Sequence, residues 1–204
     1  TDYSGDISQD FSRIMDKCEK TISLWRNQKA TMCDGCTILK EGLWPRNTEF
    51  SSLSIYGGFK SEHCNFKCFY CDATDNLLLA KERDSITIVD AIQEFITVVG
   101  HTNFAVSLSA GEITVSPYRE EAFKLLRKLN MKTSIFSNGY IFDENIYDML
   151  CSKQASLDIS IDAETRDTFY KIKRVDGFER VVKNISKYYK SGGRIELKYI
   201  IMEG

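Results

Sequence analysis

Two hydrophobic periodicities alternate along the chain. Short runs rich in β-branched and aromatic residues predict five strands, at residues 51–56, 104–109, 132–137, 156–161 and 195–202. Apolar residues spaced three or four apart predict helices at residues 87–99, 116–129, 143–150 and 178–189. Strands that alternate with helices in this order predict a parallel sheet with right-handed crossovers. The fold class is therefore α/β.

Cap residues define the predicted ends of these helices. Ser116 is expected to be the N-cap and Pro117 the first residue of the second helix, and Gly100 and Gly192 are expected to stop two others. The second helix is expected to face inward with Ala122, Leu125, Leu126 and Leu129. The last predicted helix has an apolar stripe of Phe178, Val181, Val182, Ile185, Tyr188 and Tyr189. A further helix is predicted upstream, with the stripe Phe11, Ile14, Met15, Cys18, Ile22 and Trp25.

The unusual residues of the chain follow the strands. Cysteines follow the first strand, "AGE" the second, "NGY" the third and "DAE" the fourth. A parallel sheet can stay open or curl into a barrel, and periodicity does not decide between the two. In both cases ligands bind at the C-terminal ends of the strands. We therefore expect one site at that edge.

Composition excludes several classes of protein. The chain has 204 residues, of which 43% are hydrophobic and 27% charged, and its net charge is -2, so no overall field favours nucleic acid or an acidic membrane. No apolar run approaches the roughly 18 residues of a membrane span, and the first residues lack the pattern of a secretory signal. We expect a cytoplasmic protein without a membrane partner. Because the sequence begins at Thr1, we expect it to be part of a longer protein.

The chain has seven cysteines, and their clustering indicates a metal site rather than a set of disulfides. Cys18 lies on the apolar stripe of the first helix, and Cys151 follows Met149 and Leu150. Both are predicted to be buried core thiols.

Three cysteines lie within the segment "CNFKCFYCD" at Cys64, Cys68 and Cys71. Structural zinc usually has four protein ligands in two separated pairs, which this compact run does not provide. Three thiolates on a 4Fe–4S cube leave one iron open to an exogenous ligand. The alternative is a fully protein-ligated electron-transfer cluster, whose fourth ligand is Cys33 or Cys36.

The spacing Cys-x3-Cys-x2-Cys, with Tyr70 before the last cysteine, resembles the signature of the radical S-adenosylmethionine superfamily. Later segments match the family in order: "SAGE" resembles its Gly-Gly-Glu segment, "SNG" its Thr-Asn-Gly segment, and "SIDA" its Ser-Ile-Asp-Gly strand end. The resemblance implies a partial parallel (β/α) barrel in which Cys64, Cys68 and Cys71 hold a 4Fe–4S cluster. S-adenosylmethionine would chelate the fourth iron.

The same resemblance implies a set of cofactor-binding residues: Tyr70, Ala110, Gly111, Glu112, Ser137, Asn138, Ser160, Asp162 and Arg174. Gly111 would let the backbone approach the ligand, and Glu112 would accept from the methionine ammonium, although Glu at a helix N-terminus is a common alternative. The short polar residues suit ribose hydroxyls or a carboxylate, but each also suits a turn. Arg174 resembles a residue that neutralises the methionine carboxylate; a solvated basic face with Lys171 and Lys173 explains it equally well.

Three positions depart from the family pattern. Ala110 and Ala163 replace glycines, and Ile113 replaces a frequent proline. The loss of that proline leaves the path of the loop after Glu112 open.

The implied chemistry is reductive cleavage of S-adenosylmethionine to a 5'-deoxyadenosyl radical, which abstracts hydrogen from a substrate. The expected partners are a reductant such as flavodoxin or ferredoxin and a peptide substrate. A sugar or small metabolite is the alternative substrate, and a non-catalytic iron–sulfur electron-transfer or scaffold module is the alternative function. No residue is identified as a catalytic acid or base. We expect an anaerobic or well-reduced setting, because oxygen attacks an exposed cube.

The predicted domains are residues 1–50, a helix and a cysteine-containing connector, and residues 51–204, a radical S-adenosylmethionine core that lacks its C-terminal end. The connector contains "CDGC", in which Cys33 and Cys36 supply half of a tetrahedral thiolate site across a turn. We expect an auxiliary cluster or zinc there; unpaired thiols or a disulfide are the alternatives.

Overall fold

The computed structural model describes residues 7–29, 31, 34, 51–55, 64–71, 87–109 and 111–201. Its elements, in chain order, are α1 (Ile7–Arg26), β1 (Ser52–Ile55), α3 (Ile88–Val99), β2 (Ala105–Leu108), the 3₁₀ helix η3 (Ile113–Val115), α4 (Arg119–Lys128), β3 (Thr133–Ser137), α5 (Glu144–Cys151), β4 (Ala155–Ser160), α6 (Arg166–Lys173), α7 (Phe178–Tyr189) and β5 (Arg194–Lys198). All five predicted strands are present, each within a few residues of its predicted range.

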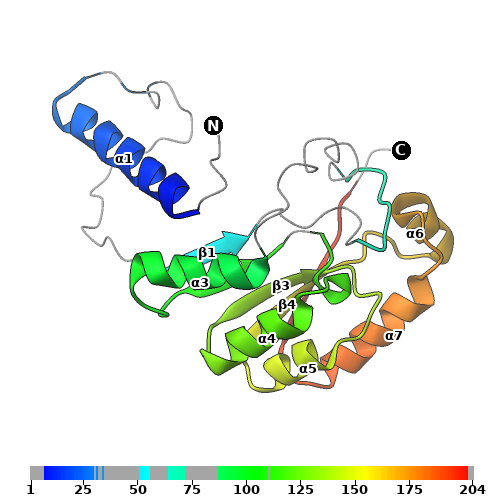
Figure 1. Ribbon diagram of the computed structural model, residues 1–204. Coiled ribbons are helices and arrows are strands. Elements are labelled where there is room, and N and C mark those ends of the chain that lie inside the picture. The colour runs from blue at the N-terminus through cyan, green and yellow to red at the C-terminus, as the bar shows by residue number, and fades with distance from the viewer. Residues whose placement is uncertain are drawn as a thin grey trace.

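The five strands form one parallel sheet in the order β1-β2-β3-β4-β5. Each strand pairs with the strand that precedes it in the sequence, so right-handed crossovers place the connecting helices on one face of the sheet. Figure 1 shows α3, α4, α5 and α7 along that face. The α/β fold class is thus confirmed, and among the described strands β1 and β5 are the two edges of an open sheet.

The core lies between the sheet and this helical layer. The strands contribute Val106, Leu108, Ile135, Leu157 and Ile159, and the helices contribute Ile92, Phe123, Leu126, Ile146 and Val181, all fully or almost fully buried. The opposite face is polar. Ser54, Ser107, Ser134 and Ser156 occupy matching positions on four neighbouring strands of that face.

Capping explains two helix ends, and the start of α4 differs from the prediction. Thr87 and Asp90 form a capping box at α3, which ends at Gly100 in the left-handed conformation. Ser116 instead ends η3, and α4 begins three residues later. The Ser116 hydroxyl accepts from the Tyr118 amide at 3.3 Å, so Pro117 lies in a turn rather than in the helix.

The two isolated cysteines are exposed, so the prediction that they are core thiols is wrong. Cys18 lies on α1, where Ile14 and Ile22 are also largely exposed and the described residues do not cover the apolar stripe. On α5 the inward positions belong to Ile146, Met149 and Leu150. A helix turns about 100° per residue, which points the following residue, Cys151, away from the core.

Helices α6 and α7 also differ from expectation. No separate helix was predicted over residues 166–173, where Thr165 caps α6. On α7, Val181 and Tyr188 are buried, but Val182 and Tyr189 are exposed. The buried Asn184 donates to the carbonyls of Gly139 and Tyr140 at 3.0 and 2.9 Å, and so holds the turn after β3 against α7. No described helix has the length and apolar character that a membrane crossing requires.

Candidate cofactor site

The loop with the three cysteines, residues 64–71, is anchored in the core by Phe66. This side chain is only 5% exposed. Its ring makes edge-to-face contacts with Tyr140 and Phe169, at centroid distances of 5.5 and 5.8 Å. The ring therefore fastens the loop to the turn after β3 and to α6.

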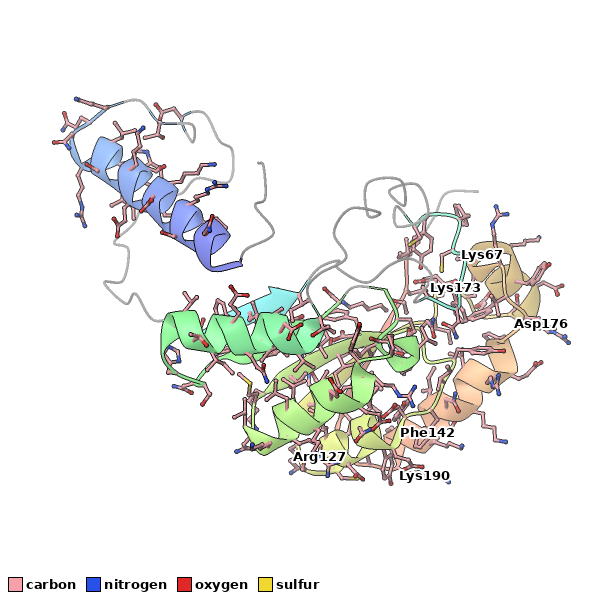
Figure 2. All side chains as sticks on the ribbon, viewed as in Figure 1. Lys67, Arg127, Phe142, Lys173, Asp176 and Lys190 are labelled. Carbon is pink, nitrogen blue, oxygen red and sulfur yellow. The ribbon has the colours of Figure 1, made fainter. Side chains whose placement is uncertain are left out.

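The backbone of the same loop docks on the C-terminal end of α6. The amides of Lys67 and Phe69 donate to the carbonyls of Lys173 and Ile172, at 3.3 and 3.1 Å. Carbonyls in the last turn of a helix lack intrahelical partners, so the loop satisfies groups that α6 leaves open. Figure 2 shows Lys67 and Lys173 close together beside α6.

Cys64, Cys68 and Cys71 are partly buried thiols. Burial raises the pKa of Cys64 to about 11. Burial also raises the pKa of Cys68, against the opposing effect of the Lys173 ammonium and a hydrogen bond with Tyr70. Because iron binds thiolates, all three thiols must release their protons when metal binds.

A cube is compatible with this arrangement of thiols. Among the described residues, no three His, Cys, Asp or Glu side chains converge on one point as the ligands of a single ion do. In a 4Fe–4S cluster each thiolate binds its own iron, so convergence on one point is not required.

A network of charged and polar groups lies next to Cys68. The Tyr70 hydroxyl donates to Asp162 Oδ2 at 2.6 Å, and Lys173 Nζ donates to the Tyr70 oxygen at 2.8 Å and to Asp162 Oδ2. Asp162 Oδ1 accepts from the Ile200 amide at 2.8 Å. Burial, followed by the bond to Asp162, raises the pKa of Tyr70, so its hydroxyl remains a donor. The network joins the cysteine loop to the ends of β4, α6 and β5.

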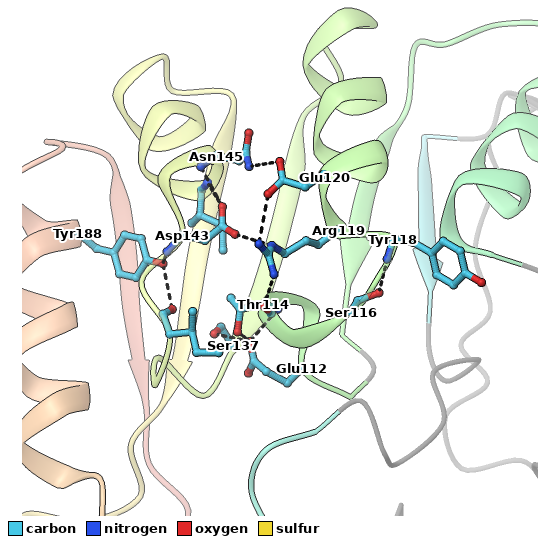
Figure 3. Close-up of polar contacts among 12 residues, drawn as sticks. Glu112, Thr114, Ser116, Tyr118, Arg119, Glu120, Ser137, Asp143, Asn145 and Tyr188 are labelled. Atoms are coloured by element: carbon cyan, nitrogen blue, oxygen red, sulfur yellow. Dashed lines mark hydrogen bonds and ion pairs between the residues drawn. The ribbon is translucent and has the colours of Figure 1, made fainter.

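Glu112 forms a second network at the same edge of the sheet. Its carboxylate is 1% exposed and accepts from the Thr114 hydroxyl at 2.7 Å, the Ser137 hydroxyl at 2.8 Å and the Asn138 amide at 2.6 Å. It also accepts from the Thr114 amide and caps η3. Burial raises the pKa of Glu112, and these hydrogen bonds oppose the rise. Figure 3 shows the carboxylate facing Thr114 and Ser137.

Arg119 holds this segment against α5. Its Nη1 donates to the Thr114 carbonyl at 3.2 Å, and its Nε lies 3.2 Å from the buried carboxylate of Asp143, the N-cap of α5. Figure 3 shows Arg119 between the two. The segment after β2 is thus fixed from both sides.

Asn65 supplies a test of whether a group is missing from the site. Its Oδ1 accepts from Asn138 Nδ2 at 2.7 Å, which orients the amide. Its Nδ2 is buried and has no hydrogen-bond partner among the described residues. A buried amide donor that lacks a partner destabilises the fold. A cofactor with acceptor atoms beside Cys64 would satisfy this donor, so the residues fit a bound group.

The structure brings most of the predicted site residues to one edge. Glu112, Ser137 and Asn138 form one hydrogen-bonded unit, and Tyr70 and Asp162 another. Ser160 is the last residue of β4 at that edge. Gly111 has φ of 59°, which is costly for residues with a side chain. Ala110, Cys33 and Cys36 lie outside the described residues.

Two basic residues, Arg174 and Lys173, have surroundings that are the reverse of those expected. Arg174 is exposed and caps α6 in the left-handed conformation. Lys173, assigned to a solvated face by one interpretation of the sequence, is 1% exposed and faces Asp162. The sequence contained only a partial signal of this burial, because Lys173 lies four residues after Phe169 and so on the same helix face.

Comparison with known families defines the class of protein. The model of the Radical SAM superfamily matches residues 60–204. Since this is most of the chain, the protein belongs to the radical SAM superfamily, which confirms the predicted family. Its 4Fe–4S cluster and S-adenosylmethionine are the cofactors of that family.

Two curated relatives match part of the chain. A probable GTP 3',8-cyclase of Saccharolobus solfataricus is 32% identical over 127 residues, covering 60% of this chain and 39% of the relative. The molybdenum cofactor biosynthesis protein moc-5 of Caenorhabditis elegans is 22% identical over 148 residues, covering 70% of this chain and 24% of the relative. The chain thus spans less than half the length of these curated relatives.

Solved structures share the fold. Streptococcus suis SuiB bound to S-adenosylmethionine superposes with a TM-score of 0.58 at 19% identity, over 76% of this chain and 35% of SuiB. The protein anSMEcpe with bound AdoMet superposes with a TM-score of 0.55 at 19% identity, over 72% of this chain and 42% of anSMEcpe. At these identities the likeness establishes the fold alone.

Proposed function

We propose that this chain is the core of a radical S-adenosylmethionine enzyme in which Cys64, Cys68 and Cys71 bind the 4Fe–4S cluster. The observation that carries the proposal is the seating of the cysteine loop. Phe66 and two backbone hydrogen bonds to α6 hold it at the edge where Glu112 and Asn138 lie. When bound, the cluster and S-adenosylmethionine supply a 5'-deoxyadenosyl radical that abstracts hydrogen from the substrate.

The chain's own residues orient the cofactors. Asn65 presents an unused amide donor beside Cys64, and Asn138 fixes that amide. Glu112 holds Ser137 and the Asn138 backbone in place, and its carboxylate is the group we assign to the methionine ammonium. Gly111, in a conformation that favours glycine, keeps the backbone open to a ligand.

The polar face of the sheet indicates the kind of substrate. Lys198 lies 3.7 Å from Asp158 and 3.9 Å from the Phe136 ring, and Arg194 pairs with Glu196. Both cations that β5 places on this face, Arg194 and Lys198, therefore have a carboxylate beside them. A triphosphate would meet two carboxylates here, whereas a peptide offers neutral amides to the serine hydroxyls. We therefore favour a peptide substrate.

A nucleotide is the second candidate, and a specific observation favours it. Relatives at 31–32% identity are probable GTP 3',8-cyclases. The balanced charges around Asp158 and Glu196 argue against a polyanion only within the part of the site that the structure describes.

Anaerobic reconstitution with iron and sulfide tests the cluster assignment. The wild-type chain is expected to bind about four iron atoms and to show the spectrum of a reduced cube after dithionite. Cys68→Ala should lose the cluster, while Cys151→Ala, which removes an exposed thiol elsewhere, should retain it. Equal iron content in both variants would contradict the assignment.

Addition of S-adenosylmethionine tests the activity. Reduced protein is expected to form 5'-deoxyadenosine, measured by mass spectrometry, and the Cys68→Ala variant is not. Consumption of GTP in the same assay would favour the nucleotide candidate over the peptide. A loaded cluster that yields no 5'-deoxyadenosine would favour the electron-transfer alternative.

A further inference from the structure

An ion pair is buried beside the cysteine loop. Lys173 is 1% exposed and Asp162 is 0% exposed, and the two are in contact. They come from different elements: Asp162 follows β4, and Lys173 ends α6. A buried pair commonly contributes little net stability compared with apolar residues of similar volume, but removal of one partner strands a charge. Its presence at the site therefore calls for a role there.

The pair holds the loop through both its side chains and its backbone. Asp162 and Lys173 both hydrogen-bond the Tyr70 hydroxyl, which lies between Cys68 and Cys71 in sequence. The Lys173 carbonyl also accepts from the Lys67 amide at 3.3 Å. The charge of Lys173 also acts on the Cys68 thiol, whose pKa it lowers. The ion pair therefore contacts the loop on both sides of Cys68, at the Lys67 amide and at the Tyr70 hydroxyl.

The two oxygens of Asp162 are already occupied within the chain. Oδ2 accepts from Tyr70 and Lys173, and Oδ1 accepts from the Ile200 amide at 2.8 Å. Asp162 also has φ of 52°, an uncommon conformation for a residue other than glycine. This arrangement suits a residue that fixes its neighbours.

We propose that the buried Asp162–Lys173 pair positions Tyr70 and the cysteine loop and sets the charge next to Cys68, and thereby the reduction potential of the cluster. This role rests on the assignment of Cys64, Cys68 and Cys71 as cluster ligands. Lys173 and Asp162 are positioning residues that act through Tyr70 and Cys68.

The charges predict opposite effects of the two single variants. A cation near the cube favours its reduced form, which carries one more electron, and an anion disfavours it. Lys173→Met removes the cation and should lower the potential, whereas Asp162→Asn removes the anion and should raise it. The double variant Asp162→Asn/Lys173→Met removes both charges and should return the potential toward that of the wild type.

The test is a redox titration of the reconstituted cluster, followed by electron paramagnetic resonance without substrate. Each single variant is expected to change the ratio of reduced to oxidised cluster about tenfold at a fixed potential, equivalent to about 59 mV for one electron. Lys173→Arg should stay within threefold of the wild type. Lys171→Met is the matched control, because it removes an exposed lysine from the same helix. It should change nothing.

Thiol reactivity in the iron-free protein provides a second measurement that does not depend on cluster loading. Tyr70→Phe removes the hydroxyl that joins the loop to the pair and leaves both charges paired, so Cys68 should react with iodoacetamide about tenfold faster than in the wild type. An unchanged alkylation rate overturns the positioning role, and this test applies even if the single variants of the ion pair do not fold.

The outcomes separate this role from the proposed function. The inference is overturned if the potentials of Lys173→Met and Asp162→Asn shift in the same direction. It is also overturned if the ratio of reduced to oxidised cluster changes less than twofold in each variant. Single variants that fold but bind no iron, while Lys171→Met binds its normal amount, support the inference, because the cysteine loop is then no longer held in place. A wild-type chain that binds no cluster contradicts the proposed function and with it the basis of this role.

Discussion

Replacement of Phe66 by alanine is expected to release the cysteine loop while the rest of the core remains folded. The ring is 5% exposed and is the loop's only fully buried side chain among residues 64–71. Full burial of a phenylalanine side chain contributes about 1.5 to 3 kcal/mol. Each of its two edge-to-face contacts, to Tyr140 and Phe169, adds about 0.5 to 1.5 kcal/mol.

These contributions predict a loss of at least about 2.5 kcal/mol in the docking free energy of the loop. Since 1.4 kcal/mol is a factor of ten, the undocked population should rise at least about 60-fold. Phe66→Leu keeps most of the buried area but loses both ring contacts, so a rise of about 5- to 140-fold is expected from a loss of about 1 to 3 kcal/mol.

Alkylation of the iron-free protein measures this population. Undocking exposes Cys64 and Cys68 and removes the burial that raises the pKa of their thiols, so both effects accelerate the reaction with iodoacetamide. Peptide mapping resolves each cysteine. Cys18 and Cys151 are exposed in the folded protein and serve as internal references whose rates should not change.

A Phe66→Ala protein whose Cys64 and Cys68 react at wild-type rates would refute the anchoring role of the ring. A parallel rise at Cys151 would also count against it, because that thiol lies on α5 and reports on the general loss of structure.

Two further predictions concern stability. Gly139→Ala should destabilise the fold by about 1 to 3 kcal/mol in urea unfolding, because Gly139 has φ of 72° and an added Cβ would lie 3.0 Å from Ile159 Cγ2. Gly100 is the control, since its φ is a similar 74° but an added Cβ would meet open space. An equal loss of stability in Gly139→Ala and Gly100→Ala would exclude a contribution from the contact with Ile159. Hydrogen bonds from Thr87, first from its side chain and then from its backbone, lower the pKa of Asp90, so their stabilisation is present above the ordinary value of 3.8 and is lost as the pH falls through the folded pKa. Asp90→Ala should therefore lower the unfolding midpoint at neutral pH more than in acid. An equal change at both pH values would contradict the capping box.

The strands and most helices could be predicted because their signals are local. Alternating or continuous apolar runs bounded by turn residues located β2, β3 and β4 within about a residue. Thr87 and Gly100 gave the ends of α3 by the same kind of signal. Helix α6 escaped because it has eight residues and only two buried apolar ones, Phe169 and Ile172, which is too short a stripe for a period of 3.6.

The candidate site could be located from the sequence but not assembled. The C-terminal ends of parallel strands meet at one edge, which placed Glu112, Ser137 and Asp162 in the same region. The sequence does not show which donor meets which acceptor. Lys173 therefore looked like part of a solvated face, although its partner Asp162 lies only 11 residues earlier. Glu112 caps η3, which is the alternative role that the sequence offered, while its contact with the methionine ammonium stays a prediction.

The contacts that hold the cysteine loop join residues far apart in the sequence. Tyr70 meets Asp162 across 92 residues and Lys173 across 103, and Asn138 reaches Asn65 across 73. A short peptide with the same three cysteines has none of these anchors. The chain must therefore fold through α6 before the three thiols are presented together, and cluster binding is then coupled to the folding of the whole sheet rather than to the loop alone. This coupling explains why a buried charge pair, remote from the sulfur atoms in sequence, holds the cysteine loop in place.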